Sequence, residues 1–181
     1  MRITAEREAR RLVIALDCNL RPALVGPLNA WQQRIEQIAQ RAAIIKLSAE
    51  DFAGGWGEEA DIEEYATRWL DQGTKLVVMT RGANGATAWH RCGNVTVPAV
   101  PVRLSDTVGA GDSFQAALLG RLAKKGRLNH CGLAMLDEAS IFDSLHYANV
   151  AASLSCERRG ADLPTQADIE AKMPMRADER D

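Results

Sequence analysis

The segment DTVGAGD at residues 106–112 combines residue types that can bind an anion at the start of a helix. Gly109, Ala110 and Gly111 carry little or no side chain, and a helical pattern begins near Ala110. The first N–H groups of a helix have no partner inside the helix, and they lie at the positive end of its dipole. A glycine-rich helix start of this kind binds anions, and the anion is often a phosphate.

Asp112 gives this segment a second chemical property. A carboxylate would repel a phosphate held permanently beside it. The arrangement makes chemical sense if Asp112 removes a proton from a hydroxyl that attacks phosphorus, while the N–H groups stabilise charge on the transferred group. The other interpretation is that the carboxylate only interacts with the positive end of the helix dipole. Residue spacing alone leaves both interpretations open.

Two other phosphate-binding loops do not fit this segment. The Walker A loop requires the pattern GxxxxGK[ST], and no Lys-Ser or Lys-Thr pair follows these glycines. The dinucleotide fingerprint GxGxxG requires a third glycine where Phe114 stands. A nicotinamide-binding dehydrogenase is therefore the weaker alternative, and binding of NADH rather than ATP would favour it.

The elements that must position this segment alternate along the chain. Short apolar runs at residues 12–16, 43–47 and 75–79 are typical of parallel strands buried on both faces. Helical patterns at residues 27–40 and 61–72 separate these runs. The order strand, helix, strand, helix, strand predicts a parallel sheet with right-handed crossovers.

The later part of the chain changes character. Residues 86–90 and 94–97 flank Cys92-Gly93 and predict an antiparallel hairpin. Helical patterns follow at residues 110–126, at 138–156 and after Pro164-Thr165. The run Gly54-Gly55-Trp56-Gly57 is expected in a surface turn. The predicted fold class is α/β, with a doubly wound, mostly parallel sheet flanked by helices and an antiparallel hairpin.

Composition and charge argue against several classes of partner. Of 181 residues, 46% are hydrophobic, which is enough for a buried core. Lys and Arg number 22 and Asp and Glu 24, so the net charge of −2 gives no general attraction to nucleic acids or anionic membrane surfaces. No apolar run approaches the roughly 18–20 residues of a membrane-spanning helix. Four cysteines without CxxC spacing predict free thiols in a reducing cytoplasm.

Several motifs together resemble the PfkB, or ribokinase-like, family of carbohydrate kinases. Residues 106–112 fill every fixed position of the family signature DTxGAGD. The other segments that resemble family motifs are 17–22 (DCNLRP, for DxNxRP), 46–51 (KLSAED, for the fructokinase-like KxSxEE), 78–86 (VMTRGANGA, for TxGxxG) and the closing 159–165. They occur in the family's order and cover about residues 12–170.

The resemblance implies ATP-dependent phosphorylation of a sugar hydroxyl, with fructose or a related ketose as the favoured substrate. Asp112 would be the catalytic base, and the backbone N–H groups of Gly109, Ala110, Gly111 and Asp112 would form the anion hole. The positions that match ATP-binding residues of the family are Thr80, Gly82 and Asn149. Asn149 also fits an ordinary asparagine on a helix surface.

The resemblance also implies positions that bind ions and the substrate. Asp106 and the carbonyl of Val108 match a monovalent-cation site, so potassium joins ATP and magnesium as an implied cofactor, although not every member depends on potassium. Asp51 stands where many members have a longer Glu tied to magnesium, so the ion would be held through water. The positions on the phosphate and substrate side are Asp17, Asn19 and Arg21. Without ligands, Asp106 would accept hydrogen bonds from local N–H groups and Arg21 would cap a carbonyl.

Members of the family carry an N-terminal half ahead of the DxNxRP strand, with a GGxxxN-type signature and most of the sugar contacts. These 181 residues contain no counterpart of that half. Residues 1–173 therefore resemble the ATP-side half of a ribokinase-like domain, and residues 174–181 form a charged tail. An unpaired sheet edge is expected to favour a homodimer or another association. The alternative function is a catalytically inactive remnant, or a nucleotide-binding half that needs a partner chain.

Overall fold

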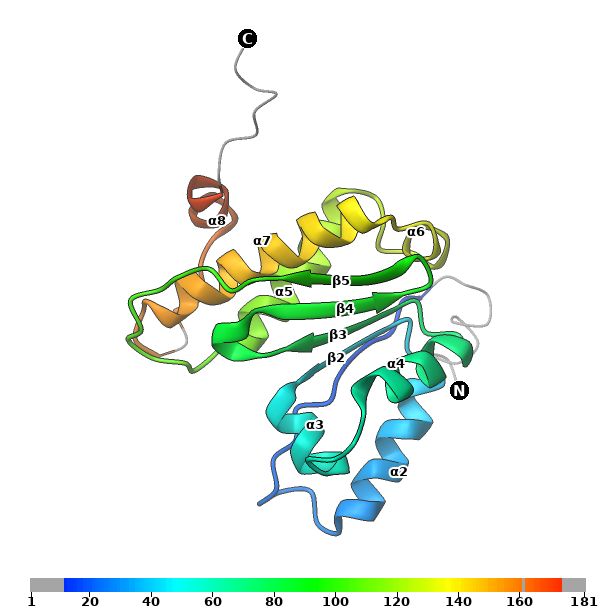
Figure 1. Cartoon of the computed structure of the whole chain (residues 1–181). Helices are drawn as coiled ribbons and strands as arrows, with labels where there is room; N and C mark the ends of the chain where they lie inside the picture. The colour runs from blue at the N-terminus through cyan, green and yellow to red at the C-terminus, as the bar shows by residue number, and fades with distance from the viewer. Residues whose placement is uncertain (1–11, 161, 174–181) are drawn as a thin grey trace.

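Five strands form one mixed sheet, and their order in the sheet follows their order in the chain (Figure 1). The computed structural model describes residues 12–160 and 162–173, so the predicted tail at 174–181 lies outside the described residues. The strands are β1 (Ala15–Asp17), β2 (Ile44–Ser48), β3 (Leu76–Thr80), β4 (Ala86–His90) and β5 (Gly93–Val97). β1, β2 and β3 are parallel, whereas β4 and β5 form an antiparallel hairpin. This arrangement confirms the predicted sheet.

Helices cover both faces of the sheet, as expected for a doubly wound fold (Figure 1). One face packs against α2 (Leu28–Ala39), α3 (Ala49–Trp56) and α4 (Ile62–Asp71), and the other against α5 (Ala110–Lys124) and α7 (Glu138–Cys156). The shorter elements are η1 (Gly82–Asn84), α6 (His130–Ala134) and α8 (Gln166–Lys172). Within the described ranges, no helix is both long and apolar enough to cross a membrane.

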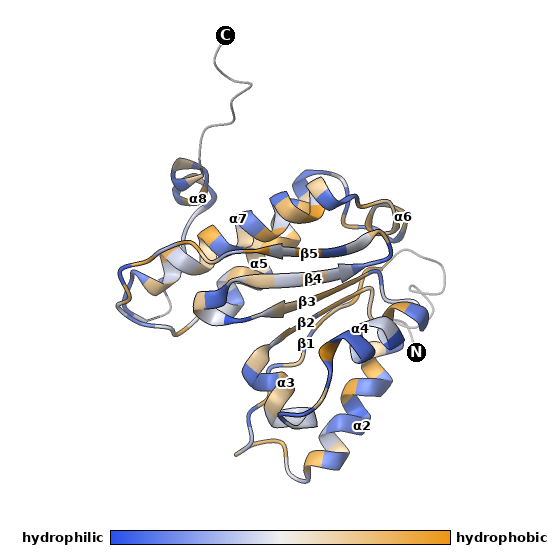
Figure 2. Cartoon of the chain, in the orientation of Figure 1, coloured by the Kyte–Doolittle hydropathy of each residue, from blue (hydrophilic) through white to orange (hydrophobic). Residues whose placement is uncertain are grey.

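The central strands are apolar on both faces because two hydrophobic cores meet at them. In β2, Ile44 belongs to the core under α5 and α7, and the next residue, Ile45, belongs to the core under α2, α3 and α4. Val77 and Val78 of β3 alternate in the same way. Figure 2 shows these strands as largely hydrophobic between helices with mixed surfaces. The continuous apolar runs in the sequence therefore mark strands buried on both sides.

β1 lies at one edge of the sheet and pairs only with β2 among the described residues. Its predicted start at residue 12 is too early, because ladder pairing begins at Ala15. All three of its residues are half-buried, whereas four of the five residues in β2 are fully buried. Such an edge presents N–H and C=O groups to which another strand can pair. Association through this edge stays a prediction.

An aromatic cluster joins α2, α3 and α4. Phe52 and Trp56 of α3 stack with their ring centroids 5.4 Å apart, and Trp31 of α2 lies 5.2 Å from Trp56. Tyr65 of α4 contacts Phe52 edge-on at 5.3 Å. Gly55 faces this cluster, since a Cβ built there would lie only 2.7 Å from a ring carbon of Trp31. The cluster therefore requires glycine at this helical position.

The surface turn predicted around these glycines is wrong. Gly54 and Gly55 lie inside α3, and Gly55 is buried. Glycine has a low intrinsic helix propensity, which is why the pair suggested a turn. The close approach of the Trp31 ring, and not helix propensity, explains why a glycine stands at position 55 within the helix.

We expect Gly55→Ala to destabilise the protein by about 1–3 kcal/mol, because the added methyl would overlap the Trp31 ring. Gly120→Ala is the matched control: Gly120 also lies within a helix, nothing lies within 4 Å of its added methyl, and Ala has the higher helix propensity. Equilibrium urea unfolding of both variants measures the difference. An unchanged free energy of unfolding for Gly55→Ala would contradict this packing.

His90, the last residue of β4, is buried and bound to backbone groups. Its Nε2 lies 3.0 Å from the carbonyl oxygen of Leu133, and its Nδ1 accepts the N–H of Cys92 at 3.1 Å. A neutral imidazole with its proton on Nε2 satisfies both contacts. Burial lowers the pKa of His90 below its ordinary value. The folded protein therefore favours the neutral side chain.

This lowered pKa predicts a loss of stability in mild acid. The folded-state pKa lies below the value of about 6.5 for an unfolded histidine, so the unfolded chain binds the proton first. The contribution of His90 is complete above about pH 6.5 and decreases as the pH falls below that value. His90→Gln should weaken the pH dependence measured by urea unfolding between about pH 5 and 6.5. Identical pH profiles for wild type and His90→Gln would contradict the assignment.

Candidate active site

The carboxyl ends of β1, β2, β3 and β5 meet at one edge of the sheet, and α5 begins beside them. The ladder aligns Ser48 of β2 with Thr80 of β3, Thr80 with Ala86, and Ala86 with Val97 of β5. Ligands of open α/β sheets bind at this carboxyl edge. The edge is therefore where the predicted site residues are expected to converge.

The start of α5 has the geometry of an anion site. Gly109 is the N-cap in a left-handed conformation, with φ of 80°, which glycine adopts without a steric penalty. The N–H of Ala110 donates to Thr107 O at 3.2 Å. Within the described residues, the N–H groups of Gly111 and Asp112 have no hydrogen-bond acceptor. Of the donors predicted for the anion hole, the N–H of Ala110 is therefore already used, whereas those of Gly109, Gly111 and Asp112 have no acceptor among the described residues.

Asp112 lies in the first turn of α5 and is exposed. Its carboxylate has no hydrogen bond or ion pair with any described residue. By contrast, Asp51 and Asp168, which occupy the same third position in α3 and α8, each accept the backbone N–H of the N-cap residue. Asp112 thus differs from an ordinary capping residue, and its oxygens are available to another molecule.

An ion pair between a buried lysine and a half-buried aspartate lies next to this helix start, and the sequence predicted a site role only for the aspartate. Lys46 Nζ lies 2.9 Å from Asp17 Oδ2, and Lys46 is 4% exposed. A Cβ built on Gly111 would lie 3.3 Å from this Nζ, so the ammonium group adjoins the first turn of α5. Lys46 was missed as a site residue, although a lysine within the apolar run 43–47 is itself a signal.

The loop after β1 is held by Asp51 of α3. Asp51 Oδ1 accepts the N–H of Leu20 at 2.8 Å, and its Oδ2 accepts the N–H of Ser48 at 3.2 Å. Asn19 has a positive φ of 41°, and Arg21 is exposed and donates to Leu20 O at 3.1 Å. Each Asp51 oxygen thus accepts one backbone N–H, and the carboxylate joins the loop after β1 to the start of α3. The described residues contain no group of three or more His, Cys, Asp or Glu side chains placed to hold a metal.

Asp106 connects the loop before α5 to the loop after α7. Its Oδ1 accepts the N–H of Val108 at 3.1 Å and its Oδ2 accepts the N–H of Gly160 at 2.9 Å. The N–H groups of Ser105 and Asp106 both donate to Cys156 O, the end of α7. The hydrogen bonds from Val108 and Gly160 hold the pKa of Asp106 below its ordinary value. The carboxylate therefore stays charged at the place predicted for a monovalent cation.

The predicted nucleotide positions lie along the same edge but do not all have free side chains. Thr80 ends β3, and its hydroxyl is 3.5 Å from Leu47 O. Gly82 is exposed at the start of η1 with φ of 50°. Asn149 of α7 is buried, and its Nδ2 donates to Pro98 O at 3.1 Å, just after β5. Asn149 thus ties α7 to the end of β5, which a surface asparagine would not do.

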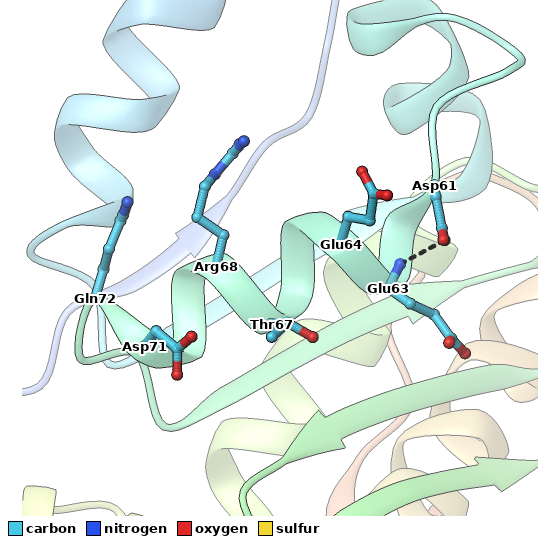
Figure 3. Close-up of a pocket in the computed structure, with 7 residues that line it drawn as sticks. All are labelled: Asp61, Glu63, Glu64, Thr67, Arg68, Asp71 and Gln72. Carbon is cyan, nitrogen blue, oxygen red and sulfur yellow. Dashed lines mark hydrogen bonds between the residues drawn. The ribbon is translucent and has the colours of Figure 1, made fainter.

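Two hollows in the surface lie away from these groups. The larger, about 660 Å³, follows the exposed side of α4, on the sheet face opposite α5, and Figure 3 shows its charged side chains. The other, about 230 Å³, lies between α5, α7 and α8 and includes Ser113 and Tyr147. Neither contains Asp112 or Lys46. The candidate site at the start of α5 is therefore assigned from its hydrogen-bonding and charged groups, not from a hollow.

The sequence matches the family described as pfkB family carbohydrate kinase over residues 3–168. The chain therefore belongs to the pfkB family of carbohydrate kinases. Its fold is ribokinase-like, and the family assignment makes it a sugar kinase sequence. Both statements confirm what the motifs indicated.

Fructokinases are prominent among its relatives. The chain is 40% identical to a fructokinase of Rhizobium leguminosarum bv. trifolii over 136 residues, which are 75% of this chain and 41% of the relative. It is 28% identical to fructokinase-1 of Zea mays, over 87% of this chain and 47% of the relative. The chain thus spans about half the length of the curated relatives it matches.

Solved structures show the same partial correspondence. A fructokinase from Vibrio cholerae O395, crystallised with fructose, ADP and calcium, superposes with a TM-score of 0.75 at 29% identity, covering 93% of this chain and 53% of that one. Aminoimidazole riboside kinase from Salmonella enterica, in complex with aminoimidazole riboside and an ATP analogue, gives a TM-score of 0.77 at 26% identity, covering 93% and 54%.

Proposed function

We propose that this chain binds ATP at the carboxyl edge of its sheet and provides the catalytic base that activates a ketose hydroxyl, with fructose as the favoured substrate. The start of α5 carries the proposal. There the free N–H groups of Gly111 and Asp112, the buried ammonium of Lys46 and the unpaired Asp112 carboxylate lie together. Positive donors suit a phosphoryl group, and a free carboxylate suits the proton of an attacking hydroxyl.

The remaining residues have supporting roles in this proposal. Thr80 and Gly82 lie beside the phosphates, and Asn149 fixes the wall of the adenine pocket. Magnesium would bind ATP oxygens and reach Asp51 through water. Potassium would lie beside the Asp106–Val108 loop. Nucleotides in the Vibrio and Salmonella structures support ATP use, and fructose in the former supports the ketose.

The acceptor sugar needs residues beyond those present here, since the chain spans about half of its relatives. The test is to join this chain to the N-terminal half of the Rhizobium fructokinase and to measure ADP release with fructose. We expect fructose-dependent release from the combination and ATP binding by this chain alone. ATP binding without turnover in the combination would favour the catalytically inactive alternative. Absence of ATP binding would overturn the proposal.

A further inference from the structure

We propose that Lys46 binds the phosphoryl group during its transfer and that Asp17 holds Lys46 in position. The inference rests on the proposed function and adds a charged ligand to the anion hole. In the register of the neighbouring strands β1 and β2, Asp17 is opposite Lys46. Ile44 lies two residues before Lys46 in β2 and points to the α5 side, so Lys46 points there too.

Two neighbours define the position of the ammonium group. Lys46 Nζ lies 2.9 Å from Asp17 Oδ2. It also lies 3.3 Å from the Cβ position of Gly111, in the turn that presents the free N–H groups of Gly111 and Asp112. Because Gly111 has no side chain, nothing on that residue separates the ammonium from the start of α5. The donors of two different elements therefore converge.

The hydrogen-bonding groups of this ion pair are incompletely satisfied, and this points to a ligand. An ammonium group has three N–H donors, and the described residues provide one acceptor for them, Asp17 Oδ2. Asp17 Oδ1 is buried and has no hydrogen-bond partner among the described residues. Burying a charge is costly unless it is paired and hydrogen-bonded, and buried polar groups rarely lack partners. An anion at the start of α5 would accept the unused N–H groups of Lys46.

The chemistry of the transfer uses such a cation. As the acceptor oxygen bonds to the γ-phosphorus, the bond from that phosphorus to the bridging β,γ-oxygen breaks and ADP leaves. The hydroxyl proton passes to Asp112. Negative charge spreads over the transferred oxygens, where a fixed ammonium and N–H groups stabilise it. Lys46 takes no part in the proton transfer, and Asp17 acts only by positioning it.

The test is calorimetric titration of the full chain with magnesium and either AMP-PNP, a non-hydrolysable ATP analogue, or ADP. Lys46→Met should weaken AMP-PNP binding about 10- to 100-fold and ADP binding much less, because ADP lacks the terminal phosphate. The double variant Asp17→Asn/Lys46→Met removes both buried charges, so it should unfold like the wild type and show the same binding loss. Lys75→Met, just before β3 at the opposite end of the sheet, should bind like the wild type.

The outcomes separate this inference from the proposed function. Normal AMP-PNP affinity in both Lys46 variants would overturn the role of Lys46 and leave ATP binding intact. Equal losses for AMP-PNP and ADP in variants that unfold normally would also overturn it, because Lys46 would then not act on the terminal phosphate. Absence of nucleotide binding by the wild-type chain would overturn the proposed function itself.

Discussion

Asp112→Asn should lower the turnover of an enzyme formed from this chain and a matching N-terminal half by about 10²- to 10⁴-fold, the usual contribution of a positioned base. The amide cannot accept the hydroxyl proton, yet it has nearly the same size as the carboxylate. ATP affinity should change little, because the N–H groups and Lys46 remain in place. Steady-state ADP release and calorimetric ATP binding measure the two effects separately.

The control is Asp61→Asn, which changes an exposed N-cap carboxylate of α4 outside the site. Asn is as good an N-cap as Asp, so this variant should keep both activity and stability. If Asp112 only interacts with the dipole of α5, its substitution would cost at most about 1 kcal/mol of stability and would spare turnover. Near-normal phosphorylation by Asp112→Asn would therefore establish the dipole interpretation and remove Asp112 as the base.

Gly85→Ala should destabilise the protein by at least about 3 kcal/mol, because its added methyl would collide with backbone rather than with a movable side chain. The built Cβ lies 2.1 Å from Val97 O and 2.7 Å from Ala99 N, and Gly85 has φ of 83°. Either β4 and β5 must separate at their ends or the turn after η1 must refold. Urea unfolding and the yield of folded protein measure the loss.

Gly82→Ala is the matched control, because Gly82 also has a positive φ, 50°, but nothing lies within 4 Å of its added methyl. Gly82→Ala should lower the free energy of unfolding by about 1–2 kcal/mol, which is the cost of holding an alanine in the left-handed conformation. The difference between the two variants then isolates the collision at Gly85. Equal destabilisation of the two would show that conformation alone explains the glycine at position 85.

The fold could be predicted wherever a single local pattern dominates. The bounds of α7 match the predicted Glu138–Cys156, since a long apolar stripe ends in polar residues on both sides. The predicted strands 43–47 and 75–79 match β2 and β3 within one residue. The prediction failed for α3, because a glycine is needed at position 55 to make room for Trp31, which belongs to another helix. Propensity carries no information about that contact.

The candidate site could be predicted only in part for a similar reason. The DTVGAGD segment indicated Asp112 and Gly111 from local helix chemistry, and the structure places them at the carboxyl edge. Lys46 could be recognised as a site residue only once the pairing of β1 with β2 was known, because this pairing brings Asp17 beside it. The sequence also could not reveal that Asp51 and Asn149 use their polar atoms for backbone groups of distant segments. Such contacts depend on tertiary structure alone.

The strand order of the sheet has a consequence for how the protein assembles. Because β1 to β5 follow one another in space as they do in the chain, each strand pairs with the strand made just before it. No pairing among the described strands therefore has to wait for a strand made much later, and closure entropy grows only slowly with the length of each crossover. We expect the sheet to grow by successive addition as the chain leaves the ribosome, with the β4–β5 hairpin completing it.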